Sequence, residues 1–167
     1  MSEKESIFSS KIKVKGVFSF KALYEFCYGW LNEESGLDLV ENEYSEKLAG
    51  DSKGIDVKWT GTKKVTDYFK FEVVVKFKVT ELTNIDIVQG GAKVSTNKGA
   101  VEISVKGNLI RDYQGKFERD AYRKFLRSIY EKWVIPARIE EYEGKLINSC
   151  DDFLNQAKAY LDLEGKK

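Results

Sequence analysis

The segment from Tyr68 to Leu82 constrains the fold of this chain more than any other part of the sequence. Apolar side chains occupy every second position from Phe69 to Val79, and lysine, glutamate or threonine fills most of the positions between them. Such alternation places one apolar face against a core and one charged face in water, as in a long strand of an antiparallel sheet. We therefore expect a sheet that is covered on one face only.

Alternation recurs elsewhere and predicts the other strands. The segments with this pattern lie at 11–15, 37–49, 55–60, 85–87 and 101–109. A break is expected at Gly90 and Gly91, and Asn97-Lys98-Gly99 has the composition of a hairpin turn, because Asn and Gly tolerate positive φ. Together these segments predict a curved antiparallel sheet of about six strands.

Two regions show the helical period of about 3.6 residues. In the first, Ser19 is a candidate N-cap, apolar side chains follow at helical spacing, and Gly36 is a candidate stop. The second region covers 117–164, and Pro136, the only proline, is expected to kink or interrupt it. The sequence therefore predicts that the sheet packs on one N-terminal helix and on a long C-terminal helical region kinked near Pro136.

The length of the chain and the order of these elements indicate one domain. The 167 residues are close to the usual domain size of about 100–150 residues, and the sequence contains no internal repeat and no low-complexity linker. We assign residues 1–167 to a single α+β domain, in which residues 1–9 are expected to be flexible.

Charge and cysteine content predict the compartment. The 28 Lys and Arg residues balance 27 Asp and Glu residues, which does not suit a generic binder of polyanions. Cys27 and Cys150 both fall in helical segments, and we interpret them as buried thiols rather than as a disulfide. The polar N-terminus and the lack of an uncharged apolar run of about 18 residues predict a soluble, cytoplasmic protein without a transmembrane segment.

The order of the elements resembles that of the helix-grip (START-like) superfamily, in which a curved antiparallel sheet wraps a long C-terminal helix. Members of that superfamily often carry a cavity, so the resemblance implies a carrier of a small apolar ligand. The chain is also similar to small uncharacterised archaeal α+β proteins, on the run Phe125-Leu126-Arg127-Ser128-Ile129-Tyr130 followed by Ile139-Glu140-Glu141-Tyr142-Glu143. This second resemblance implies no activity.

Residues suited to catalysis or metal binding are sparse. The chain has no histidine, and its two Ser-x-x-Lys pairs, Ser10 with Lys13 and Ser95 with Lys98, are as many as chance predicts. Neighbouring carboxylates on the C-terminal helices point apart, and the two cysteines form no CxxC pair. We therefore predict a protein that is not an enzyme and that uses no cofactor or metal.

Two sets of side chains are candidates for binding. Six aromatic residues are expected to point inward, where they line a cavity for a small apolar ligand or, as we favour, fill a packed core. They are Trp30, Trp59, Phe69, Phe71, Phe77 and Trp133. Lysines on the solvent side of the strands form a candidate basic face for nucleic acid or an acidic membrane, although we favour a solubilising role. These lysines are Lys58, Lys70, Lys76, Lys78 and Lys106.

The C-terminal helical region has opposite charge in its two halves. Seven bases and three acids lie in 116–138, and seven acids and two bases lie in 139–164. Such halves can pack against each other within one chain or between two chains, and any surplus of their apolar stripe would form an interface. The leading hypothesis is therefore a non-enzymatic, soluble protein that binds a protein partner or self-associates through its C-terminal helices. The helix-grip-like carrier and the lysine-face binder are the alternatives.

Overall fold

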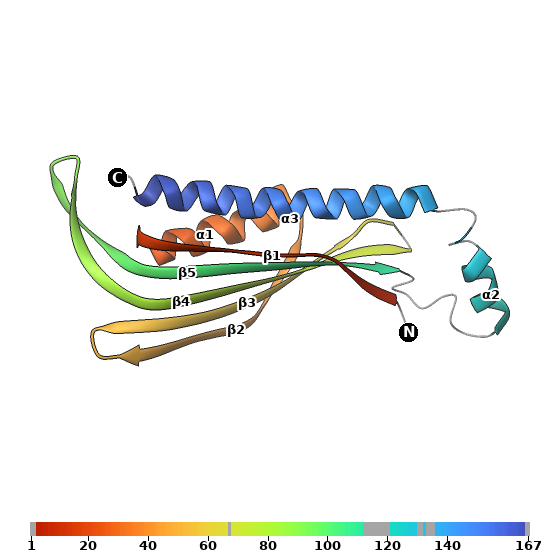
Figure 1. The fold of residues 1–167 in the computed structure, drawn as a ribbon, viewed down its shortest axis with the longest axis horizontal. Coiled ribbons are helices and arrows are strands. Elements are labelled where there is room, and N and C mark those ends of the chain that lie inside the picture. The colour runs from red at the N-terminus through yellow and green to blue at the C-terminus, as the bar shows by residue number, and fades with distance from the viewer. Residues whose placement is uncertain (1–2, 67, 112–120, 130–131, 133–135, 166–167) are drawn as a thin grey trace.

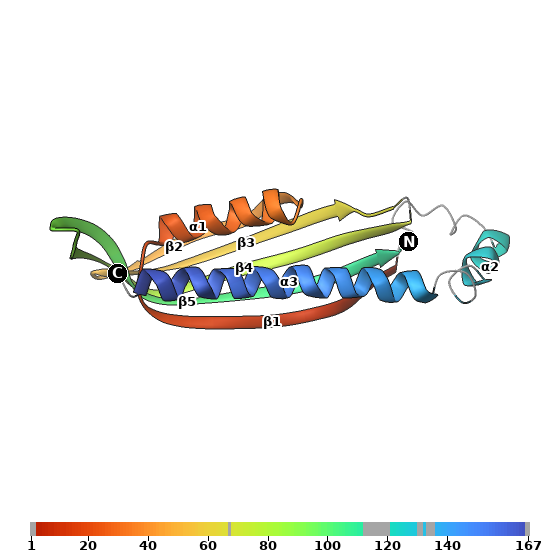
Figure 2. The ribbon, with the colours of Figure 1, turned by 90° about the horizontal axis from the view of Figure 1, so that it is seen from above.

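The structure is a computed structural model that describes residues 3–66, 68–111, 121–129, 132 and 136–165. In chain order its elements are β1 Glu3–Phe18, α1 Phe20–Gly29, the π-helix η1 Trp30–Glu34, β2 Asp38–Ala49, β3 Ser52–Lys64, β4 Phe69–Gln89, β5 Ala92–Arg111, α2 Ala121–Ile129 and α3 Pro136–Gly165. The five strands form one antiparallel sheet in the order β1-β5-β4-β3-β2, and α1 and α3 lie along the same face of it (Figures 1 and 2). The predicted α+β class is confirmed.

Among the described residues the sheet has five strands, where the sequence predicts about six. β4 continues without interruption to Gln89, and the turn into β5 lies at Gly90 and Gly91, whose φ angles of 59° and 80° are left-handed. The prediction of a hairpin turn at Asn97-Lys98-Gly99 is wrong, because these residues lie inside β5. Asn and Gly permit a turn without requiring one, and the Gly90-Gly91 pair already supplies it.

The N-terminal segment is part of the sheet. β1 pairs with β5 from the Glu3–Arg111 pair to the Phe18–Asn97 pair. Residues 3–9, for which the sequence predicts flexibility, therefore belong to a hydrogen-bonded strand.

The N-terminal helix begins and ends where the sequence predicts. The Ser19 hydroxyl oxygen accepts a hydrogen bond from the backbone N–H of Ala22 at 3.3 Å, which caps the first turn of α1. The helix continues into η1, and the chain then turns at Gly36 with a φ of 68°.

The C-terminal region forms α2 and α3, and Pro136 is the first residue of α3. The fixed φ of proline suits the first turn of a helix, where its missing N–H would have no partner within the helix. The predicted kink falls largely on 130–131 and 133–135, which lie outside the described residues.

The apolar stripe of α3 is used within the chain. Side chains that recur from Tyr142 to Leu161 are buried against the sheet and α1. The approach is closest at Gly107 of β5, where an added Cβ would lie 3.1 Å from Cys150 Sγ. Among the described residues of α3, the large apolar side chains that remain exposed are Ile147 and Leu163.

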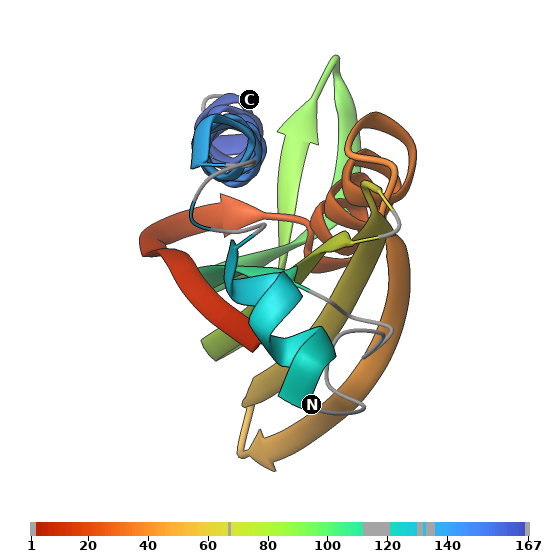
Figure 3. The same cartoon turned by 90° about the vertical axis from the view of Figure 1, so that its right-hand side faces the viewer.

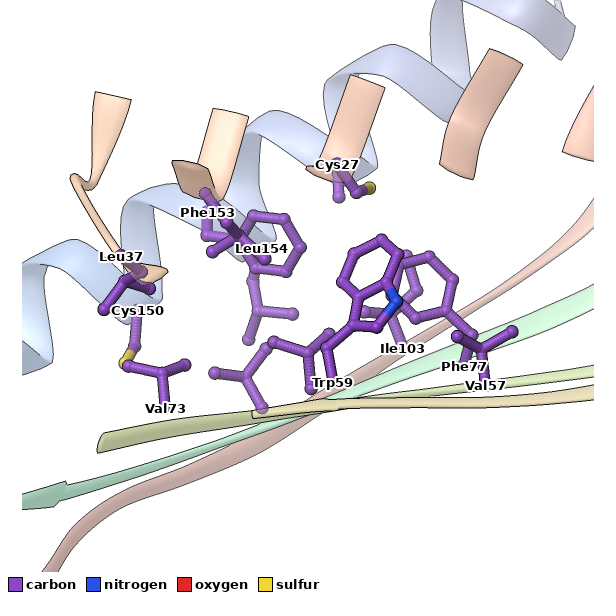
Figure 4. Close-up of a cluster of buried hydrophobic side chains, with 14 of the residues drawn as sticks. Cys27, Leu37, Val57, Trp59, Val73, Phe77, Ile103, Cys150, Phe153 and Leu154 are labelled. Atoms are coloured by element: carbon purple, nitrogen blue, oxygen red, sulfur yellow. The ribbon is translucent and has the colours of Figure 1, made fainter. Parts of the chain in front are cut away.

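Aromatic rings fill the space between the sheet and the two helices (Figure 4). Trp59 of β3, Phe77 of β4 and Phe153 of α3 are at most 1% exposed. The ring centroids of Trp59 and Phe77 are 4.9 Å apart, and those of Phe153 and Trp30 are 5.7 Å apart. These are contact distances for aromatic pairs, so this region is a packed core.

Cys27 and Cys150 are free thiols, and both are buried in this core (Figure 4). Burial raises the pKa of Cys150 to about 12 and also raises the pKa of Cys27 above its ordinary value. Because the thiolate is the reactive form, both residues are expected to resist a colorimetric disulfide reagent in the native protein and to react fully in denaturant. Rapid labelling of either thiol before unfolding would contradict this placement.

Candidate functional site

A pocket of about 270 Å³ opens where β1 passes into α1. Figure 2 shows this junction at the end of the sheet opposite α2. Residues of α1 and of four strands line the pocket: Phe20, Lys21, Tyr24, Tyr44, Glu46, Lys53, Leu82 and Asn97. Four of these side chains provide apolar walls and four provide polar groups. Apolar walls with a small number of polar groups are the usual composition of a site for a small molecule.

A bulge in β2 positions two of the lining residues. Asn42 is skipped in the register between β2 and β3, and the Thr60 hydroxyl donates a hydrogen bond to Asn42 Oδ1 at 2.5 Å. An extra residue reverses the alternation of the side chains that follow it. Tyr44 and Glu46 therefore share the face of Glu41, which is the face that α1 covers.

Glu41 connects α1 to β3 beside the pocket. Its Oε1 accepts hydrogen bonds from the Tyr24 hydroxyl at 2.6 Å and from Trp59 Nε1 at 3.3 Å. Tyr24 also packs edge-on against two rings, at centroid distances of 5.0 Å from Trp59 and 6.2 Å from Tyr44. These contacts fix the orientation of the Tyr24 ring in the pocket wall.

Both tyrosines of the pocket are held in the neutral state. Burial, followed by the hydrogen bond to Glu41, raises the pKa of Tyr24 to about 12. Burial, followed by the hydrogen bond to Glu46, raises the pKa of Tyr44 to about 12, and the Tyr44 hydroxyl donates to Glu46 Oε1 at 2.9 Å. Both hydroxyls already donate to a carboxylate, so these residues contribute ring surface to the pocket rather than a reactive phenolate.

The hairpin formed by β4 and β5 closes the other side of the pocket. Asn97 Oδ1 accepts a hydrogen bond from the backbone N–H of Phe20 at 3.1 Å, and Asn97 Nδ2 donates one to Asn84 Oδ1 at 2.7 Å. The register of β4 shifts between 80 and 83, and Leu82 in this bulge is buried in the pocket wall. Asn97 thus joins the start of α1 to the hairpin.

Of the aromatic residues that the sequence suggests as a cavity lining, none that the structure describes borders this pocket. Those buried on the covered face of the sheet are Trp59, Phe69, Phe71 and Phe77. Trp30 is partly buried and packs against Phe153 of α3, and Trp133 lies outside the described residues. The buried members belong to the packed core, and Trp59 reaches the pocket through its contact with Tyr24.

The lysines of the candidate basic face lie on the solvent side of the sheet, and acidic side chains lie among them. Lys78 stands between Asp56 of β3 and Glu102 of β5, and Lys58 pairs with Lys76. Lys70 and Lys106 lie on the same side of β4 and β5. A second pocket, of about 330 Å³, lies on this face and has three lysines and three acids in its lining: Lys58, Lys76, Lys78, Glu43, Asp56 and Glu102. Such mixed charge does not form the uniformly positive surface that a polyanion requires.

Sequence reasoning missed the residues that line the pocket. Tyr24 could have been identified as a candidate, because Tyr24 and Tyr28 are four residues apart in a predicted helix and therefore share one face. Tyr44 and Leu82 could not be found in this way, because Tyr44 follows a bulge and Leu82 lies within one, and no pattern in the sequence marks either bulge.

The comparisons with known proteins assign no family. No protein-family model matches the chain, and no curated protein sequence matches it. Among the described residues, no three Cys, Asp or Glu side chains are grouped so that they could hold a metal ion. None of the described helices has the length and apolarity that crossing a membrane requires.

Proposed function

We propose that this protein is a non-enzymatic binding protein that holds a small, mainly apolar ligand in the pocket between α1 and the sheet. The observation that carries the proposal is the set of aromatic walls, Phe20, Tyr24 and Tyr44, around a space of about 270 Å³. Ligand sites usually have volumes of about 300–1,000 Å³, so the ligand is expected to be no larger than one or two fused rings.

The charged groups of the pocket favour an acidic group on the ligand. Lys21 and Lys53 line the pocket together with one acid, Glu46. Glu46 already accepts the Tyr44 hydroxyl, and the Lys53 Nζ lies 3.8 Å from its Oε1. Lys21 and Lys53 thus place two cations in the lining, which suits a carboxylate or a sulfonate on the ligand.

The order of the strands also supports a helix-grip-like carrier. β1 lies beside β5, the last strand of the meander, and α3 runs along the covered face (Figure 1). In this proposal the ligand occupies the end of the sheet near the start of α1, and the core beneath α3 is solid. Self-association through α3 receives less support, because most of the apolar stripe of α3 is buried within the chain.

Anilinonaphthalene sulfonate, a fused aromatic ring with one sulfonate, is the probe that tests this proposal. The full chain is expected to bind the probe and to increase its fluorescence. Tyr44→Ala is expected to weaken binding about fivefold, because it removes about 40 Å² of apolar wall at about 25 cal/mol per Å². Fluorescence titration of both proteins gives the two Kd values.

Tyr28→Ala is the matched control for this titration. Tyr28 packs on Trp59 at a centroid distance of 5.5 Å but does not line the pocket, so its removal is expected to leave the Kd unchanged. Phe125→Ser, in α2, tests whether the probe binds at that exposed helix. The proposal fails if the fluorescence does not increase, or if either control variant weakens binding as much as Tyr44→Ala does.

A further inference from the structure

α2 carries an apolar stripe that the rest of the described chain leaves exposed. Its sequence, Ala-Tyr-Arg-Lys-Phe-Leu-Arg-Ser-Ile, has large apolar residues at the spacing of one helix face. Tyr122, Phe125, Leu126 and Ile129 are 69%, 60%, 38% and 38% exposed, respectively. Figures 1 and 2 show α2 beyond the end of the sheet, away from α1, and in Figure 3 this end of the molecule faces the viewer. A contiguous apolar stripe in water indicates an interaction surface.

Most positions of α2 between these apolar residues are basic. Arg123 and Lys124 are exposed, and the helix contains three basic residues and no acidic one. The surrounding segment, 116–138, holds seven bases and three acids. A helix with this pattern matches the interface of an anionic bilayer, where apolar side chains reach the acyl chains and cations contact the phosphates.

In a second copy of this chain, α2 offers an apolar stripe but carries the same positive charge, and α3 offers negative charge but no apolar counterpart. The exposed side of α3 is acidic, with Glu140, Glu141 and Asp151. Its exposed large apolar residues, Ile147 and Leu163, lie about 24 Å apart along the helix at 1.5 Å per residue. The stripe of α2 spans about 10 Å and would meet mostly polar side chains on α3. An anionic lipid surface provides acyl chains for the apolar side chains of α2 and phosphates for its basic side chains, so it is the better match.

We propose that α2 docks the protein on the surface of an anionic lipid bilayer, with Tyr122, Phe125, Leu126 and Ile129 inserted into the interface. This goes beyond the proposed ligand site, which lies at the opposite end of the sheet (Figure 2). A bilayer bound at α2 leaves the pocket facing the aqueous phase. The two activities are therefore separable by mutation.

Sedimentation of the full chain with lipid vesicles tests this inference. Binding is expected to vesicles of phosphatidylcholine that contain about 30% phosphatidylserine and not to vesicles of phosphatidylcholine alone. It is expected to weaken as the salt concentration rises from about 50 to about 500 mM, because ions screen the attraction. Phe125→Ser is expected to weaken binding about tenfold, and Lys124→Gln about fivefold.

Leu48→Ser is the matched control, because Leu48 is 82% exposed on β2 and its removal deletes a comparable apolar group elsewhere. This variant is expected to bind vesicles as the unmodified chain does. The inference is overturned if the unmodified chain does not sediment with anionic vesicles, if neutral vesicles bind it equally, or if Leu48→Ser weakens binding as much as Phe125→Ser. A dimer that Phe125→Ser abolishes, in a chain that binds no vesicles, would instead assign α2 to a second copy.

Discussion

Phe153→Ala is expected to lower the free energy of unfolding by about 3–5 kcal/mol, which is the usual cost of removing a fully buried phenylalanine. Phe153 is 0% exposed and lies in the core cluster (Figure 4). The centroid of its ring is 5.7 Å from that of Trp30 in the N-terminal helical segment. The site is bounded by helix and strand backbone, so it can collapse only partly around the space left by the ring. Unfolding in urea, followed by circular dichroism, measures the difference.

Phe125→Ala is the matched control for this substitution. Phe125 is 60% exposed on α2, so its loss is expected to change the free energy of unfolding by no more than about 0.5 kcal/mol. Equal effects of the two substitutions would mean that α3 does not pack on the sheet as described.

Gly107→Val is expected to destabilise the protein by about 1–3 kcal/mol through overpacking. An added Cβ at Gly107 would lie 3.1 Å from Cys150 Sγ, 3.3 Å from Leu146 Cγ and 3.4 Å from Phe8 Cβ. The two further methyl groups of valine require α3 to move away from β5. Unfolding in urea again gives the free energy, and Cys150→Ala in the same chain is expected to restore part of it by making room.

Gly144→Ala is the control for the glycine substitution. Gly144 lies inside α3, and an added Cβ there would meet no atom within 4 Å. Alanine at this position is expected to stabilise the helix by about 0.5–1 kcal/mol. If Gly107→Val were also neutral or stabilising, the close contact between α3 and β5 would be refuted.

The alternation of side chains predicted most of the sheet, because burial on one face selects apolar residues at every second position. Residues 68–82 lie almost wholly inside β4, and 101–109 lie inside β5. The break expected at Gly90-Gly91 is the turn between these strands, whereas the hairpin turn predicted at Asn97-Lys98-Gly99 is wrong, because asparagine has uses other than turns. Asn97 instead caps the start of α1 through its side chain.

The pocket could not be predicted from the sequence, because its geometry depends on bulges in β2 and β4. The extra residue Asn42 sets the direction of Tyr44 and Glu46, and the shift between 80 and 83 sets that of Leu82. A bulge changes which face a side chain occupies without changing the local composition. The mixed charge on the solvent side of the sheet could not be predicted either, because it depends on the register, which decides which residues of neighbouring strands lie opposite each other.

The pairing of β1 with β5 has a consequence for synthesis. Glu3 of β1 is paired with Arg111 of β5, so β1 leaves the ribosome long before β5 has been synthesised. The meander from β2 to β5 is made of hairpins that close locally, whereas the sheet is complete only when a distant segment returns to its edge. Contacts between such distant segments slow folding, so β1 is expected to be the last strand to join. During most of translation, β1 therefore has no β5 to pair with. On a polysome, where neighbouring copies are close together, this favours pairing of β1 with the β5 of another copy.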